Sequence, residues 1–130
     1  MTLISLSDRT KLAKALNADL FISLHCNHSH NPIARGIEVY VGKNESGNLK
    51  ESVWFAYQLQ NQIKKQLGFK SRGVKFSNFQ VLRKAGGFYH EALVELGFLS
   101  NDYEYVYLLD NRNTRELASI LLMRIYSVKN

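Results

Sequence analysis

The sequence contains few of the residues that cross-link a chain and no long apolar run. One cysteine among 130 residues excludes an internal disulfide. No stretch of 18 apolar residues is present, so we expect no membrane-spanning helix. Residues 1–5 lack a basic region followed by an apolar core, so they do not form a signal peptide, and we expect any export signal to lie upstream. The remaining composition, 45% hydrophobic and 22% charged, is typical of a globular domain.

Acidic residues are absent from one segment of a chain whose net charge is +6. The segment from Lys64 to Lys84 contains only basic charges, contributed by Lys64, Lys65, Lys70, Arg72, Lys75, Arg83 and Lys84. A local positive excess suits a polyanionic partner such as a wall polymer, nucleic acid or anionic lipid. A solvated face without a partner explains the same charges equally well.

The apolar pattern predicts an α/β fold in one domain covering residues 1–130. Helical spacing predicts helices at about 5–17, 48–67, 101–109 and 113–128. Apolar runs predict strands at about 20–24, 36–41, 79–83 and 92–96, with loops at 27–35 and 69–78. The order along the chain is therefore helix, strand, strand, helix, strand, strand, helix, helix. This order favours three layers, with helices flanking a twisted, largely parallel sheet. Because the first element is a helix, we expect a preceding strand and helix to be missing.

Several residues predict where the helices begin and end. Pairs with capping-box spacing, in which a side chain accepts from the amide three residues later, are Ser5 with Asp8, Asn101 with Glu104, and Asn113 with Glu116. Gly68 stands where a left-handed residue commonly ends a helix. Leu12, Ala13 and Leu16 predict the buried stripe of the first helix.

A histidine closes the first predicted strand. His25 follows the apolar run 20–24, and chemistry in an open α/β sheet gathers beyond the carboxyl ends of its strands. Its imidazole could bind zinc, act as a general base, or be a satisfied polar group. Cys26 points to the other face of an extended strand and reads as a small buried hydrophobe. His28 and His30 lack metal-site spacing and fit a polar loop.

A carboxylate closes the last predicted strand. Glu95 ends the apolar run 92–94, and burying an unpaired carboxylate costs several kcal/mol or raises its pKa. A raised pKa suits general acid–base catalysis in a crevice. The alternative is a structural carboxylate paired with a cation such as Arg83. Glu91, on the same stretch, reads as an ordinary surface acid.

Six segments of the sequence together carry a resemblance to a known family. They are 5–9 (SLSDR), 18–27 (ADLFISLHCN), 36–40 (GIEVY), 71–75 (SRGVK), 81–83 (VLR) and 93–101 (LVELGFLSN). In this order they closely resemble the zinc-dependent N-acetylmuramoyl-L-alanine amidases of bacterial cell walls. The segment 93–101 is the most specific of the six. The resemblance covers nearly the whole chain.

The resemblance implies roles for four residues. Members of the family have a six-stranded sheet and bind zinc through two histidines and a glutamate, while a second glutamate acts on the attacking water. His25 corresponds to one zinc ligand and Glu95 to the catalytic glutamate. We assign Arg72 and Asn27, which lie in two of the matching segments, to substrate binding. The other zinc ligands lie upstream of Met1, so this chain resembles the C-terminal two thirds of an amidase, and we expect it to bind zinc poorly and hydrolyse little alone.

The implied function is peptidoglycan hydrolysis at the amide between N-acetylmuramic acid and L-alanine, in the periplasm or at the cell wall. A non-catalytic cell-wall-binding module of the same fold is the main alternative. A nucleic-acid-binding domain is a weaker alternative, suggested by Phe69, Phe76 and Phe79 among basic residues, and it gives Glu95 no purpose. A missing strand would also leave a sheet edge through which the chain could self-associate.

Overall fold

The computed structural model describes residues 3–43, 49–83 and 88–128. Its elements follow in the order α1 (Leu6–Ala15), β1 (Leu20–Asn27), β2 (Ile37–Gly42), α2 (Leu49–Leu67), β3 (Ser71–Ser77), α3 (Gln80–Arg83), β4 (His90–Phe98), α4 (Asp102–Leu109) and α5 (Asn111–Val128). The sequence also predicts a turn at about 42–47 and an interruption of the secondary structure at Gly86-Gly87. The second of these, most of the first, and the basic residue Lys84 fall outside the described residues.

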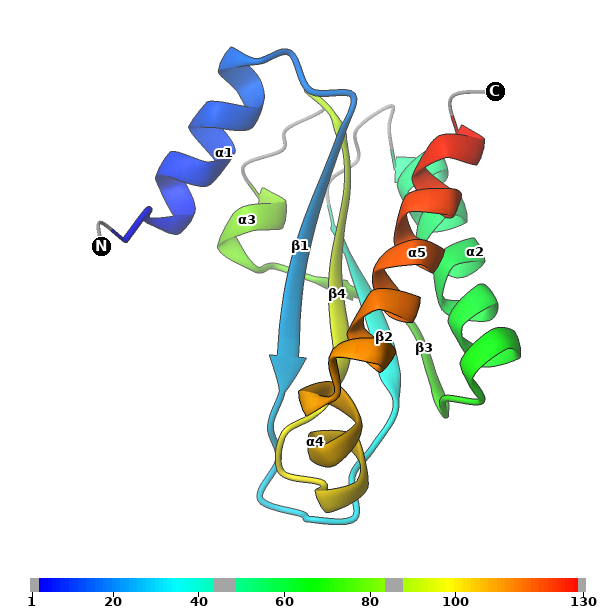
Figure 1. Ribbon diagram of the computed structural model, residues 1–130. Helices are drawn as coiled ribbons and strands as arrows, with labels where there is room; N and C mark the ends of the chain where they lie inside the picture. The colour runs from blue at the N-terminus through cyan, green and yellow to red at the C-terminus, as the bar shows by residue number, and fades with distance from the viewer. Residues whose placement is uncertain (1–2, 44–48, 84–87, 129–130) are drawn as a thin grey trace.

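The four strands form one mixed sheet in the order β1-β4-β2-β3 (Figure 1). β1 is parallel to β4 and β2 is parallel to β3, whereas β2 and β4 are antiparallel. The predicted α/β fold is therefore confirmed, with two of the three strand pairings parallel. β1 lies at one edge of the sheet. β4 pairs with both β1 and β2, although it comes last in the sequence, so the order of the strands in the sheet differs from their order along the chain.

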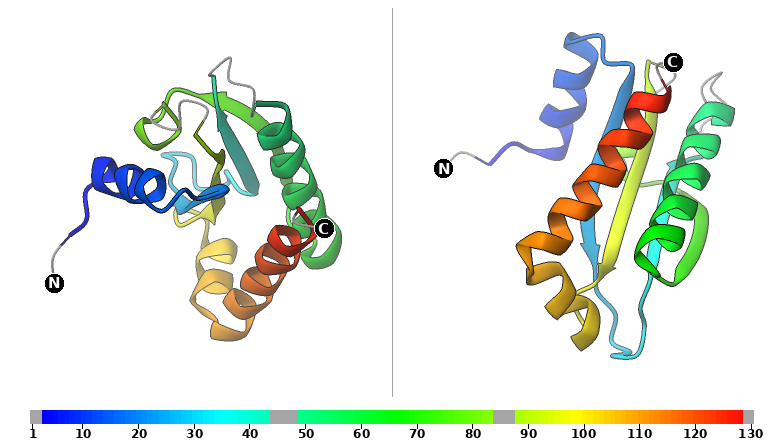
Figure 2. Two further views of the ribbon diagram at one scale, coloured as in Figure 1. Left: turned by 90° about the horizontal axis from the view of Figure 1, so that it is seen from above. Right: turned by 45° about the vertical axis from the view of Figure 1, so that its right-hand side comes forward.

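Helices cover both faces of the sheet, so the predicted three layers are present (Figure 2). α2 and α5 lie on one face, where they enclose the main core. The strands contribute alternate residues to this core, as a strand must when one of its faces is buried. Its fully buried members from β2 are Ile37, Val39 and Val41. α2 contributes Phe55, Ala56, Leu59 and Ile63, and α5 contributes Leu117, Ile120 and Leu121.

The opposite face of the sheet is covered over only part of its length. Ala13 of α1 packs with Tyr89, Ala18 and Phe21. Val81 and Leu82 of α3 form a second small cluster with Leu93 and Tyr40. Both clusters lie toward the beginning of β1 and β4, as the strand pairing of Phe21 with Glu91 shows. The other end of this face is left to polar side chains.

Two predicted elements were wrong. The predicted strand 79–83 is replaced by the short helix α3 (Gln80–Arg83), and the predicted loop 69–78 contains β3. A short apolar run such as Val81-Leu82 does not distinguish a helix from a strand. β3 was missed because its sequence, SRGVKFS, is polar; it is a strand through pairing with β2, including Val39 with Val74 and Tyr40 with Lys75.

The predicted helix ends are confirmed at three of four positions. Ser5 Oγ accepts from the Asp8 amide at 3.1 Å, and Asn101 Oδ1 accepts from the Glu104 amide at 3.2 Å. Gly68 follows α2 with a φ of +68°, in the left-handed region that favours glycine. The cap predicted at Asn113 is wrong because α5 begins two residues earlier, where Asp110 Oδ1 accepts from the Arg112 amide at 2.8 Å.

The buried stripe predicted for α1 is only partly correct. Ala13 is buried, but Leu12 and Leu16 are 53% and 69% exposed. The helix therefore contacts the rest of the described structure through its small residues and leaves its larger apolar side chains in solvent. Among the described residues, no helix is long and apolar enough to cross a membrane.

Candidate functional site

Three acid–base side chains lie in one row across the sheet. In the strand register His25 of β1 pairs with Glu95 of β4, and Glu95 pairs with Glu38 of β2. Residues that pair directly in a sheet share a face, so the three side chains lie on the same face. This is the face that α1 and α3 cover incompletely, and the row lies near the carboxyl ends of β1 and β4.

The regular pairing of β1 with β4 ends immediately after this row. His25 is opposite Glu95, but Asn27 is opposite Phe98, so β4 contains one extra residue. Such bulges redirect side chains and are common beside active sites. Gly97 occupies the bulge with a φ of +145°, a conformation that other residues rarely adopt. The bulge therefore marks where the regular register of β1 and β4 ends and the polar part of this face begins.

Glu38 is the centre of the hydrogen-bond network at this end. Its carboxylate is 3% exposed and accepts from Asn27 Nδ2 at 2.7 Å, Tyr40 Oη at 3.0 Å and Arg72 Nε at 3.2 Å. Lys75 Nζ donates to it as well. Burial alone would raise the pKa of the Glu38 carboxyl, but the bonds from Lys75, Tyr40 and Arg72 outweigh burial and lower that pKa. Glu38 is therefore held as a carboxylate.

Glu95 has the opposite environment. Its Oε2 is buried and has no hydrogen-bond partner among the described residues. Burial, and secondarily the negative charge of Glu38, raises the pKa of the Glu95 carboxyl. The two neighbouring carboxyls are thus driven apart in acidity, one toward the charged form and the other toward the protonated form. This divergence is the arrangement by which proteins produce an acid–base group.

His25 is half-buried at the edge of the sheet. Its Nε2 lies 2.7 Å from Ser23 Oγ, two residues earlier on the same face. The alternative considered for Glu95, a structural pair with a cation such as Arg83, is not found among the described ion pairs, and Arg83 is exposed on α3. Glu95 thus pairs with His25 in the strand register and forms no ion pair within the described structure.

The two residues predicted to bind substrate also lie at this end of the face. Arg72 Nη1 donates to the Arg35 carbonyl oxygen at 3.5 Å, and its guanidinium carbon lies 5.0 Å from the centre of the Phe98 ring. Asn27 bonds to Glu38 through Nδ2, while its Oδ1 accepts from the His28 amide at 2.9 Å. Both side chains are therefore fixed beside Glu38, and Arg72 remains 31% exposed to an incoming ligand.

Several sequence interpretations need correction. Cys26 is exposed rather than buried. Glu91 is 6% exposed rather than a surface acid, because it lies beneath the end of β2, where its Oε1 accepts from the Gly42 amide at 3.1 Å. Two of the three phenylalanines considered for stacking nucleic-acid bases pack against other side chains, Phe69 against Tyr107 and Phe79 against Tyr40.

Glu38 is the site residue that the sequence did not reveal. It lies on β2 between the buried residues Ile37 and Val39, and the apolar alternation of this strand predicts only which side faces the core. The sequence does place an acid and a tyrosine, Glu38 and Tyr40, on the same side of this strand, where they alternate with core residues. Its partners Arg72 and Lys75 are more than 30 residues away, so only the pairing of β2 with β3 connects them.

Comparison with known protein families agrees with this arrangement. The model of a family described as N-acetylmuramoyl-L-alanine amidase matches residues 2–125. The chain belongs to this amidase family. All six segments that carried the resemblance lie within the matched residues.

Individual amidases show how much of each protein the chain covers. The N-acetylmuramoyl-L-alanine amidase LytC of Bacillus subtilis is 33% identical over 101 residues, which are 77% of this chain and 19% of LytC. The crystal structure of an N-acetylmuramoyl-L-alanine amidase from Clostridium difficile 630 superposes with a TM-score of 0.87 at 30% identity, covering 97% of this chain and 66% of that one. The catalytic domain of CwlV from Bacillus (Paenibacillus) polymyxa gives a TM-score of 0.84 at 28% identity, with 98% and 66% covered. The chain thus spans less than two thirds of each relative.

Within residues 3–43, 49–83 and 88–128, the donor side chains do not form a full zinc site. Among the described residues, no three or more His, Cys, Asp or Glu side chains are grouped to hold a metal ion. A catalytic zinc needs three protein ligands and one open position. His28 and His30 are exposed in the loop after β1, and His90 begins β4 at the end of the sheet remote from His25. His25 is therefore the one histidine in the row with Glu95.

Proposed function

We propose that this chain is part of a peptidoglycan amidase that hydrolyses the amide between N-acetylmuramic acid and L-alanine, and that it supplies the residue that transfers the proton. The observation that supports this most directly is the row of His25, Glu95 and Glu38 on one open face. Family membership supplies the reaction class. The place of action that follows is the periplasm or the cell wall.

Glu95 is the proposed catalytic residue. A base with a raised pKa can accept a proton from the attacking water and return it to the departing amine. The pKa of Glu95 is raised in this way, and its Oε2 has no competing partner among the described residues. The nitrogen of L-alanine leaves as an amine, so the proton taken from water balances the bond that breaks.

His25 is the proposed metal-binding residue, and Zn²⁺ is the proposed cofactor. When bound, zinc would supply an acidified water and a polarised carbonyl. One imidazole cannot retain zinc against water, and the described residues do not provide the remaining ligands. We therefore predict weak zinc binding by this chain and little turnover by it alone. The further ligands, on this proposal, come from outside the described residues.

Arg72 and Asn27 are the proposed substrate-binding residues. Arg72 retains free guanidinium hydrogens, and arginine binds the carboxylates of a peptide in a forked geometry. The lysines and arginines between 64 and 84 add a positive field that suits the anionic wall. Of these, Arg72 and Lys75 lie at the site itself, on Glu38.

Release of muropeptides from purified peptidoglycan with added zinc tests the proposal. We expect slow release that falls at least about 100-fold in Glu95→Gln, while Glu116→Gln, an exposed acid on α5, leaves the rate unchanged. Binding of peptidoglycan without any release would favour the alternative, a wall-binding module of the same fold. Tight one-to-one zinc binding in calorimetry, lost in His25→Ala, would contradict the incomplete site.

A further inference from the structure

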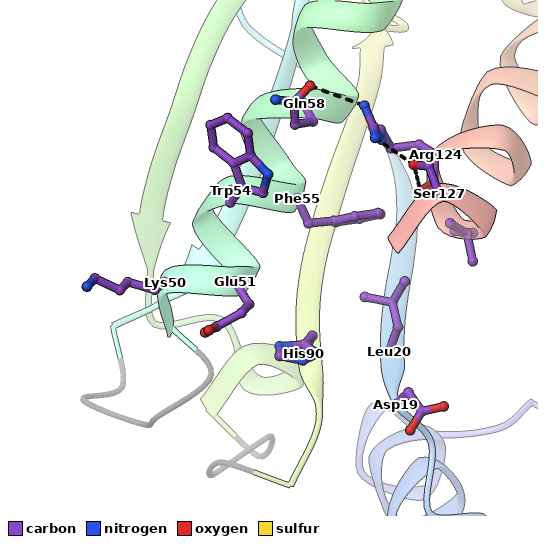
Figure 3. A pocket seen from close by; sticks show the side chains of 11 residues that line it. Asp19, Leu20, Lys50, Glu51, Trp54, Phe55, Gln58, His90, Arg124 and Ser127 are labelled. Carbon is purple, nitrogen blue, oxygen red and sulfur yellow. Dashed lines mark hydrogen bonds between the residues drawn. The ribbon is translucent and has the colours of Figure 1, made fainter. Parts of the chain in front are cut away.

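A large pocket lies away from the row of His25, Glu95 and Glu38. It has a volume of about 720 Å³ and is bordered by α2, α5 and the first residues of β1 and β4 (Figure 3). Leu20 and His90, which begin these two strands and pair with one another, both line it. The pocket is therefore on the face covered by α2 and α5, at the opposite end of the sheet. Its size falls within the range of small-molecule sites.

One end of the pocket carries an arginine that has no acidic partner among the described residues. Arg124 of α5 donates from Nη1 to Gln58 Oε1 at 3.1 Å and from Nη2 to Ser127 Oγ at 2.5 Å, and both acceptors are neutral. Arg124 Nε is buried and has no partner among the described residues. A buried donor left unpaired costs about 1–3 kcal/mol. A carboxylate that accepted from Nε would satisfy it with a charge-assisted bond.

The other end of the pocket carries an acid and a second unpaired group. Glu51 and His90 lie near the beginning of β4, away from Arg124 (Figure 3). His90 Nδ1 is buried without a hydrogen-bond partner in the described structure. Glu51 forms none of the ion pairs found among the described residues. Asp19 and Lys50 also line the pocket, and the Lys50 side chain extends away from His90 (Figure 3). With two acids against one lysine, this end suits a cationic or hydrogen-bond-donating group.

Apolar side chains lie between the two ends. Phe55 extends into the pocket from α2 and is 3% exposed, and Leu20 and Ile125 line the same space (Figure 3). Trp54 stands at the border with 63% of its surface exposed, stacked on Tyr57 with the ring centres 6.0 Å apart. A ligand in this pocket would meet a cation, then an apolar surface, then an acid.

We propose that this pocket binds a short peptide with free ends. The peptide's carboxylate pairs with Arg124, an apolar side chain lies on Phe55, and the ammonium group pairs with Glu51. The charge order of the pocket is complementary to such a zwitterion, and a peptide of about three residues fits within the volume of a typical ligand site. The proposal needs neither zinc nor turnover, because it concerns the other face of the sheet.

Tryptophan fluorescence offers a direct test, because Trp54 is the only tryptophan in the sequence. The probe is the tripeptide Ala-Leu-Ala, titrated into the wild-type chain alongside its C-terminal amide and its N-acetyl form. We expect a saturable change in Trp54 emission, with affinity reduced about 10-fold or more when either charge is removed. Arg124→Gln should weaken the free tripeptide to a similar extent. Arg115→Gln, an exposed arginine on the same helix, is the matched control and should bind as wild type does.

Four results would overturn the proposal. The first three are no emission change up to about 10 mM tripeptide, about equal affinity for the free and amidated peptides, and equal weakening by Arg124→Gln and Arg115→Gln. Acetate binding as tightly as the tripeptide would reduce the pocket to a simple carboxylate site and also contradict it. Should Arg124→Gln unfold, as circular dichroism would show, the comparison of the three peptides on the wild-type chain decides the matter.

Discussion

His25 and Glu95 are direct partners across β1 and β4, and their side chains share one face of the sheet. The two residues are 70 positions apart along the chain, but the strands that carry them are adjacent in the sheet. Glu38 continues the row on the other side of Glu95. A carboxyl with a raised pKa therefore lies between a histidine and a second carboxyl whose pKa is lowered.

Glu38→Gln should destabilise the fold by about 2 kcal/mol. The substitution removes the negative charge to which Arg72 and Lys75 donate, at a carboxylate that is 3% exposed. Breaking a fully buried ion pair costs more, but the two cationic side chains are 31% and 40% exposed and recover part of their hydration. Urea unfolding of both proteins measures the difference.

Asp8→Asn is the control for that experiment. Asp8 pairs with Lys11 at 3.8 Å on an exposed helix surface, where an ion pair contributes less than about 1 kcal/mol. An equal loss of unfolding free energy in the two variants would show that the buried Glu38 ion pairs stabilise the fold no more than an exposed ion pair does.

Stability should fall as the pH rises because of Glu91. Burial raises the pKa of this carboxyl to about 7, although the bond from the Gly42 amide opposes the change. A raised pKa means that the folded chain holds the proton more tightly than the unfolded chain does. The stabilisation is therefore complete below about pH 4.5, the usual value, and is lost as the pH rises through 7. By the same relation, the loss attributable to Glu91 is on the order of 3 kcal/mol.

Glu91→Gln tests this pH dependence. The amide oxygen can still accept from Gly42, but it does not titrate, so the slope of stability between pH 5 and 7.5 should become shallower. Urea midpoints at several pH values measure the slope. An unchanged slope would mean that Glu91 is ionised in the folded chain throughout this range.

Asn101→Ala should cost about 2 kcal/mol, more than a helix cap usually contributes. Asn101 is 5% exposed, caps α4 through Oδ1, and also donates from Nδ2 to the Pro32 carbonyl oxygen at 3.1 Å. The substitution removes both bonds and leaves buried groups unpaired. Ser5→Ala removes an exposed cap of the same kind from α1 and should cost less than about 1 kcal/mol. Thermal unfolding compares the two variants, and a larger effect at Ser5 would contradict the assignment.

The chain should self-associate through the free edge of β1. β1 pairs with β4 on one side, and no strand of the described structure pairs with its other side. Apolar side chains flank this edge, including Leu24, which is 52% exposed. Exposed strand edges of this kind pair with other chains. Sedimentation velocity should show the average mass rising with concentration.

Leu24→Lys should reduce that association, because lysine on an edge strand opposes pairing. Tyr103→Lys, at a residue of α4 that is 81% exposed, is the control for added charge and should associate as wild type does. A wild-type chain that stays monomeric across the concentration range would rule out the edge as an interface.

The sequence alone determined the fold class, most helix and strand positions, and two of the three members of the row. Local signals were sufficient there: apolar runs ending in His25 and Glu95, caps at Ser5 and Asn101, and a left-handed glycine at Gly68 all act within a few residues. The order of the strands was decided only by the tertiary structure. β3 is a strand because β2 pairs with it, and Glu38 joins Glu95 because β4 inserts between β1 and β2. Pairing between distant segments depends on register and burial, which no local pattern of residues records.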